Sequence, residues 1–131
     1  MQKGTREWVR KAEKNFIGAC IIVERSEPLN ENVCYDCHQC VEKYLKALLH
    51  ELAMPIPRTH DLERLRLLLL PHFYVLRPFY RGFSFLTTFG VEIRYPGRDP
   101  TKRQARGALR LATRVRELAR SLLGLRPRRK K

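Results

Sequence analysis

The last third of the chain carries apolar residues at steps of three and four, a spacing that fits one face of an α-helix and no β-strand. Asp99 and Pro100 are suited to be the N-cap and the first helical residue, and Gly124 is a typical helix end. Cations recur every fourth residue on the opposite side. This pattern predicts an amphipathic helix that packs on a core. The apolar set is Ala105, Ala108, Ala112, Val115, Leu118, Ala119 and Leu122, and the cationic set is Lys102, Arg106, Arg110 and Arg114.

The first half of the chain shows the same periodicity and predicts two long helices. One has Thr5 as its N-cap and stops before Pro28. The next is capped by Asn30 or Asn32 and continues to Leu52. Because the link between them is short, we expect the two helices to be antiparallel neighbours.

The middle of the chain predicts two further helices. Thr59 is expected to cap a short helix, with Asp61 in its first turn and Pro71 at its end. The aromatic-rich segment 73–89 is expected to form a fourth helix, interrupted near Pro78. A turn is expected at residues 94–97.

These elements together predict the fold class. The sequence has no strand-like alternation of any length and no repeat, so we expect an all-α protein. Its architecture should be an up-and-down antiparallel helical bundle of four to five helices over residues 1–124, followed by a basic C-terminal tail, 125–131. The shared helical phase predicts that seven side chains are buried: Trp8, Phe16, Cys37, Tyr44, Leu48, Val115 and Leu122.

The charge balance indicates the class of partner. The chain of 131 residues has a formal net charge of +14, from 27 Lys and Arg against 13 Asp and Glu. Such a surplus attracts polyanions such as RNA, nucleotides or acidic protein surfaces. Residues 1–14 are polar, and no apolar run approaches the roughly 20 residues that cross a bilayer. We therefore expect a cytoplasmic protein with no membrane segment.

Three of the four cysteines are spaced as a C-x-x-C-x-x-C run, which resembles a metal site. On a helix, however, each three-residue step rotates by about 300°, so Cys34, Cys37 and Cys40 fan across a face. No second pair of ligands is available. We expect the thiols to pack in the core and bind no metal, and no cofactor is indicated. Cys20 is expected level with Cys37 or Cys40 across the helix pair, which leaves a chance contact open.

Four motifs, in order along the chain, resemble the HEPN domain family. The first is Ala12-Glu13-Lys14-Asn15-Phe16, which is similar to the family's Ala-Glu-x-Asp-Leu. The second helix carries Gln39, Glu42, Lys43, Leu45, Lys46, Ala47, Leu48 and Leu49 at the family's spacing. Thr59-His60-Asp61-Leu62 and Arg94-Tyr95-Pro96 complete the pattern.

The resemblance implies an antiparallel helical bundle, usually a homodimer. Its members are RNA-directed toxins, partners of minimal nucleotidyltransferases, or RNA- and nucleotide-binding modules of toxin-antitoxin and defence systems. The ribonucleases of the superfamily carry Arg, four to six residues, and then His. No His follows Arg94 at that distance, and Asn15 replaces an expected carboxylate. Arg66 and His72 match the spacing but lie elsewhere in the chain.

Enzyme activity is therefore left open, with Arg94 and His60 as weak catalytic candidates. His60, Asp61, Arg94 and Tyr95 can line a cleft for a nucleotide phosphate, because a guanidinium binds phosphate bidentately. Alternatively, His60 and Asp61 belong to a helix start, with His60 hydrogen-bonded inside the bundle. Arg94 can equally pair with Glu13 or Glu42.

The cationic stripe Lys102, Arg106, Arg110 and Arg114 completes the predicted binding residues. Like charges at four-residue spacing repel, which favours an anionic partner over a merely solvated face. We predict a protein that binds RNA or nucleotide as the partner of a minimal nucleotidyltransferase. The alternatives are a metal-independent ribonuclease toxin and a structural dimer without ligand.

Overall fold

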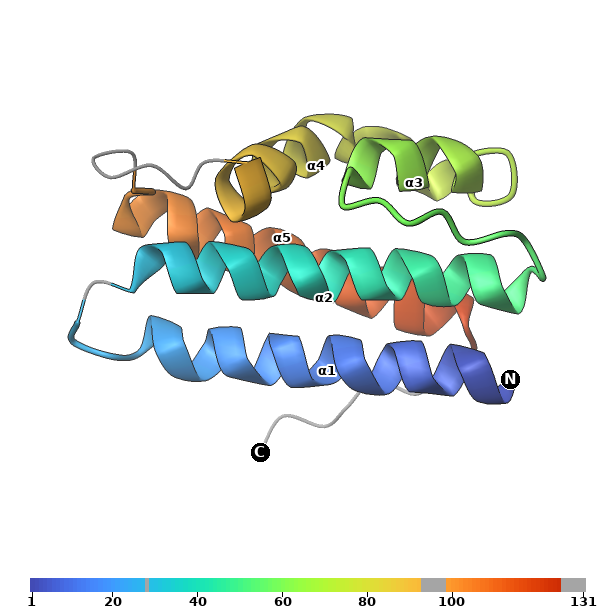
Figure 1. Cartoon of the computed structure of the whole chain (residues 1–131), viewed down its shortest axis with the longest axis horizontal. Coiled ribbons are helices and arrows are strands. Elements are labelled where there is room, and N and C mark those ends of the chain that lie inside the picture. Colours follow the sequence, from blue (N-terminus) through green and yellow to red (C-terminus); the bar gives the residue numbers. More distant parts are fainter. Residues whose placement is uncertain (28, 93–98, 126–131) are drawn as a thin grey trace.

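The computed structural model describes residues 1–27, 29–92 and 99–125 (Figure 1). Within these ranges there is no strand, which confirms the predicted all-α class. Five α-helices are joined by a 3₁₀ segment and a π turn. They are α1 (Lys3–Val23), α2 (Asn30–Glu51), α3 (Leu62–Leu69), the 3₁₀ segment η1 (Tyr74–Phe79), α4 (Tyr80–Thr87), the π turn η2 (Thr88–Glu92) and α5 (Lys102–Leu122).

The helices form three layers around α2. Helices α1 and α2 lie side by side and run antiparallel, as predicted from their short link, and α5 packs behind α2 (Figure 1). Helices α3 and α4 cover the remaining side of α2. Residues 52–61 double back along α2, so that α3 starts near its middle. Helix α5 therefore reaches α1, α2 and α4 at once.

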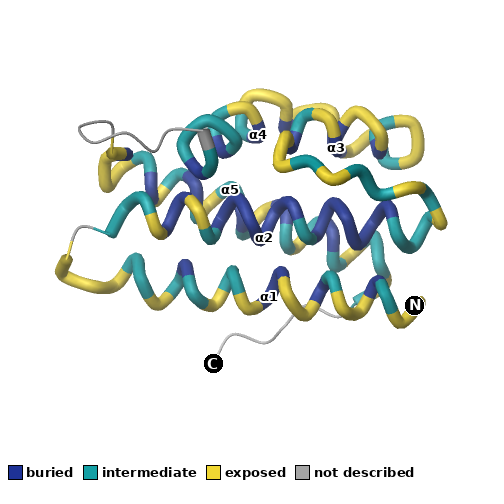
Figure 2. Tube along the Cα trace, in the orientation of Figure 1, coloured by how far each residue is buried: buried dark blue, intermediate teal, exposed yellow. Residues whose placement is uncertain are grey.

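Helix α2 is the centre of the core. It contacts α1, α3, α4, α5 and η2, and most of its residues are buried on every side (Figure 2). A helix enclosed on all sides needs partners for its polar groups, and α2 buries His38, Gln39, Glu42 and Lys46 along with its leucines. Each fully buried leucine contributes about 2 kcal/mol of hydrophobic stabilisation.

The predicted start of α1 is wrong. The helix begins at Lys3 with Gln2 as its N-cap, and Thr5 is fully buried within the first turns. The Thr5 hydroxyl donates to Glu51 Oε1 at 2.9 Å and lies 3.1 Å from His50 Nδ1. Thr5 is therefore used to tie α1 to the end of α2, so it does not cap its own helix.

The prediction that Asn30 or Asn32 caps α2 is also wrong, because the N-cap is Leu29 and no side chain caps the helix. Two further predicted caps are displaced along the chain. Asp61, two residues after Thr59, is the N-cap of α3 and accepts from the Glu63 amide at 3.0 Å. Helix α5 is capped by Thr101, two residues after Asp99, in a reciprocal capping box with Gln104. In both cases the side chain satisfies amides that the first helical turn leaves unpaired.

The aromatic segment 73–89 is helical but not one regular helix. Pro78 lies inside η1, and a regular α-helix starts only at Tyr80. The π turn follows, where a side chain at Gly90 would meet the His38 Cβ at 2.7 Å and the Cys34 carbonyl oxygen at 3.0 Å. This close approach of η2 to α2 admits only glycine. The turn expected at residues 94–97 lies outside the described residues.

Four of the seven residues predicted as buried are confirmed: Cys37, Tyr44, Leu48 and Val115. Trp8, Phe16 and Leu122 are only partly buried and pack at the edge of the core. The Lys46 ammonium lies 5.6 Å from the Trp8 ring centre, and the Arg116 guanidinium lies 4.7 Å from that of Phe16. Cations thus cover these two rings, because the rings lie at the border of the core.

Candidate functional site

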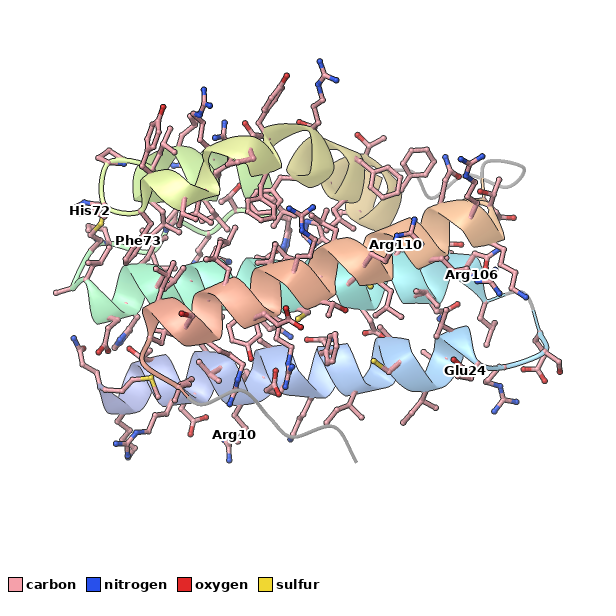
Figure 3. All side chains as sticks on the ribbon, turned by 180° about the vertical axis from the view of Figure 1, so that it is seen from behind. Arg10, Glu24, His72, Phe73, Arg106 and Arg110 are labelled. Carbon is pink, nitrogen blue, oxygen red and sulfur yellow. The ribbon has the colours of Figure 1, made fainter. Side chains whose placement is uncertain are left out.

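A cleft of about 750 Å³ lies between the C-terminal end of α1 and the first half of α5. All four predicted cations of α5 line it: Lys102, Arg106, Arg110 and Arg114. The facing wall is residues 23–26, and Glu24, Arg106 and Arg110 are found at the same end of the molecule (Figure 3). We call this the α1–α5 cleft. The structure therefore gathers the whole predicted stripe at one site.

The composition of the α1–α5 cleft suits an anion with an apolar part. Its described lining holds five cations and one carboxylate, Glu24. Arg25, the fifth cation, is held by Glu27 at 2.7 and 3.1 Å. Val23 and Leu109 supply apolar surface to the lining. Guanidinium groups bind phosphate oxygens bidentately, and the apolar residues can pack against a sugar or base.

Arg114 connects the cleft with the outer layer of the bundle. Its guanidinium lies 5.2 Å from the ring centre of Phe79, a buried residue of η1. Three residues after Phe79, a side chain at Gly82 would meet the Leu111 Cδ2 of α5 at 2.8 Å. The start of α4 therefore packs directly on α5, next to the cationic side chains.

The residues from 59–62 are placed elsewhere, and neither His60 nor Asp61 lines the α1–α5 cleft. His60 Nδ1 donates to Glu42 Oε1 at 2.7 Å, and Lys46 Nζ donates to Glu42 Oε2 at 2.9 Å. His38 Nε2 donates to the His60 carbonyl at 2.7 Å. Burial lowers the pKa of His38, although the bond to that carbonyl and the Glu42 charge act against it. The structure thus shows His60 as an exposed residue that is hydrogen-bonded to the buried Glu42, and Asp61 as a helix cap.

A second ionic cluster, which the sequence did not suggest, joins α1, α2 and α5. Arg116 donates to Glu13 from Nε at 2.6 Å and from Nη2 at 2.7 Å. The Tyr44 hydroxyl donates to the same carboxylate, and Arg120 Nη1 lies 3.9 Å from it. Burial raises the pKa of Glu13, but the bonds from Arg116 and Tyr44 outweigh it and hold the pKa below its ordinary value. These groups fix the packing of the three long helices.

Asn15, which departs from the family motif, bridges α1 and α2. It donates to Asp36 Oδ1 at 3.0 Å and accepts from Lys43 Nζ at 2.6 Å. An amide serves both bonds because it carries a donor and an acceptor. An aspartate here would place its charge against that of Asp36.

Arg66 and His72 match the ribonuclease spacing in the sequence, but one of them is buried and the other is exposed. Arg66 is buried and donates to both oxygens of Glu63 at 2.6 and 2.9 Å, and also to the Arg77 carbonyl at 3.2 Å. His72 is exposed in the turn after α3 (Figure 3). Arg66 thus holds α3 to η1. The other candidates, Arg94 and Tyr95, lie outside the described residues, as does any pairing of Arg94 with Glu13 or Glu42.

The cysteines are packed in the core, as predicted. Cys34, Cys37 and Cys40 are fully buried free thiols, and Cys20 is partly buried. Burial raises the pKa of Cys34 to about 11 and raises that of Cys37 and Cys40 further. Among the residues that the structure describes, no three His, Cys, Asp or Glu side chains converge as metal ligands.

The comparisons with known proteins agree with the motifs. The family model of the HEPN domain matches residues 5–122, which is most of the chain. No curated protein and no solved structure match it. In the described part of the chain, none of the helices is long and apolar enough to span a membrane.

Proposed function

The chain belongs to the HEPN domain family, and on that premise we propose that it binds RNA or a nucleotide in the α1–α5 cleft. The observation that carries the proposal is that Lys102, Arg106, Arg110 and Arg114 all line one concave site. Four like charges in one cleft repel each other unless an anion neutralises them. A phosphate backbone or a nucleotide phosphate group supplies that charge.

The first experiment replaces three cleft cations with glutamine, in the variant Lys102→Gln/Arg106→Gln/Arg110→Gln. Arg114 is kept because its guanidinium packs over Phe79. Each phosphate contact contributes about 0.7 to the slope of log K against log salt for single strands, so losing three contacts should lower the slope by about 2. Affinity for a fluorescent single-stranded RNA is measured at several salt concentrations.

The matched control is Lys3→Gln/Lys11→Gln/Lys14→Gln, which removes the same charge from exposed positions of α1. It should keep most of the wild-type affinity and slope, because these residues do not line the cleft. If both triple variants lose affinity equally, only the overall charge matters and the cleft is not a site. If neither triple variant loses affinity for RNA, then RNA is not the ligand of the α1–α5 cleft.

The resemblance to HEPN proteins also supports two proposals about partners. We propose that the chain forms a homodimer, with twice the 15.5 kDa mass of one chain in light scattering. We further propose a minimal nucleotidyltransferase as its protein partner, in a toxin-antitoxin or defence setting. Co-expression with a nucleotidyltransferase encoded beside it, followed by tagged purification, tests the second proposal. Recovery of this chain alone contradicts it.

A further inference from the structure

The outer layer of the bundle exposes an unusual share of apolar side chains. Of the nine large hydrophobic residues that are exposed in the described ranges, five lie between positions 67 and 80. Tyr74 is 67% exposed and Tyr80 is 47% exposed. Figure 2 shows the outer edge of α3, η1 and α4 as exposed. These five residues are Leu67, Leu68, Tyr74, Val75 and Tyr80.

Arginines accompany both tyrosines. The Arg77 guanidinium lies 5.5 Å from the Tyr74 ring centre, and that of Arg81 lies 5.7 Å from the Tyr80 ring centre. Arg81 Nε also donates to the Tyr80 hydroxyl at 2.9 Å. Arg77 and Arg81 are both exposed. We call the set Tyr74, Arg77, Tyr80 and Arg81 the tyrosine face.

The charge of this layer is one-sided. Residues 62–87 contain four arginines and one acidic residue, Glu63. That carboxylate is already bound by Arg66. An approaching ligand therefore meets aromatic rings beside the exposed guanidinium groups of Arg77 and Arg81. Aromatic rings interleaved with cations are the common means of holding single-stranded nucleic acid, where bases stack on rings and phosphates meet the charges.

We propose that the tyrosine face stacks unpaired bases of an RNA strand whose phosphates occupy the α1–α5 cleft. This inference rests on the proposed function and specifies its ligand as single-stranded RNA. A duplex keeps its bases stacked inside the helix and offers none to the rings. The protein should therefore bind single strands in preference to duplexes.

Continuity with the cleft favours RNA over other occupants of this surface. Arg114 lines the cleft and also lies over Phe79, which directly precedes Tyr80. The cationic lining of the cleft thus contacts η1, the segment that also carries Tyr74 and Arg77 of the tyrosine face. An RNA strand has a charged backbone for the cleft and flat bases for the tyrosine face. A flat anionic lipid surface could meet the exposed tyrosine face but could not enter a concave cleft.

The experiment compares two RNA probes of equal length with the full chain. One carries all its bases, and in the other most bases are replaced by abasic sites, so that both have the same phosphates. The wild type should bind the complete strand more tightly. Tyr74→Ala/Tyr80→Ala should weaken binding of the complete strand by about fivefold or more for each tyrosine. In this variant the difference in affinity between the complete strand and the abasic strand should largely disappear.

Two further variants control the comparison. Tyr74→Phe/Tyr80→Phe keeps the rings and should retain the preference for bases, whereas Tyr35→Ala removes an exposed ring from α2 and should change neither affinity. If the double alanine variant binds the complete strand as tightly as the wild type does, the proposal for the tyrosine face is overturned. The proposal that the α1–α5 cleft binds RNA is not affected by that result. Absence of binding to either probe by the wild type removes RNA from the proposed function and overturns this proposal with it.

The same preparations test two other outcomes. A wild type that binds duplex as tightly as single-stranded RNA contradicts base stacking. The wild type is also tested for co-sedimentation with vesicles of anionic phospholipid. If it sediments with them and the double alanine variant does not, while both proteins bind RNA equally, the tyrosine face binds a lipid surface and the proposal is overturned.

Discussion

At the scale of single residues, the carboxylate of Glu13 determines how α1, α2 and α5 fit together. It receives hydrogen bonds from Arg116 and Tyr44, which come from two different helices. The Arg116 guanidinium in turn covers the Phe16 ring. Removing one partner of a buried ion pair leaves the other charge without compensation, which is costly.

We predict that Glu13→Gln lowers the free energy of unfolding by about 3 kcal/mol at neutral pH. The pKa of Glu13 is lowered in the folded state, so its contribution is present above the ordinary pKa of 4.5 and is lost as the pH falls through the folded-state value. Urea unfolding of both proteins from pH 7 down to pH 3 should show the difference shrinking. A difference that stays constant over this range contradicts the assignment.

The cysteines give a second prediction. Because burial raises the pKa of Cys34, Cys37 and Cys40, the reactive thiolate form is scarce at neutral pH. A thiol-reactive maleimide should modify partly buried Cys20 first in the native protein. The other three should react only after denaturant is added. Peptide mass spectrometry locates the label, and rapid native labelling of Cys37 would show that the core opens there.

At the scale of elements, the sequence predicted each helix because hydrophobic periodicity is a local property. Helix ends were less predictable. Thr5 has the chemistry of a cap but is used to bind Glu51, a residue far along the chain. The aromatic segment was difficult because Pro78 lies inside a 3₁₀ stretch before α4, and because the π turn that follows packs Gly90 against His38 of α2, a contact between residues far apart in the sequence.

The capping box of α5 provides a test at this scale. Thr101→Ala removes the side chain that accepts from the Gln104 amide at 3.1 Å, and we expect a loss of about 1 kcal/mol in stability. Ser121→Ala, at an exposed position in the last turn of the same helix, is the control and should change stability little. Chemical denaturation measures both. Equal effects would mean that helix propensity, and not capping, was changed.

At the scale of the whole molecule, half of the candidate site was accessible from the sequence. The cationic stripe of α5 follows from its four-residue spacing. The opposite wall, residues 23–26, depends on where α1 ends relative to α5, which only tertiary packing decides. The separation of His60 from the cleft was likewise not predictable, because it depends on residues 52–61 folding back along α2.

The net charge of +14 leads to a prediction for the whole fold. Self-repulsion destabilises a compact chain of one sign, and salt screens it. The thermal midpoint should therefore rise with sodium chloride concentration, and rise further with sulfate at equal ionic strength if the α1–α5 cleft holds anions. Differential scanning calorimetry measures both. A midpoint that falls as salt is added would show that attractive pairs, and not repulsion, dominate.

The ion pair between Glu13 and Arg116 joins residues that are 103 positions apart. On a ribosome, α1 and α2 emerge and can pair long before α5 is synthesised. During that interval the Glu13 carboxylate has its Tyr44 partner on α2 but lacks its guanidinium partner, so the nascent hairpin misses the ion pair that ties it to α5. Completion of the last helix supplies the missing charge and closes the bundle. Folding of the bundle should therefore be completed only after α5 has been synthesised.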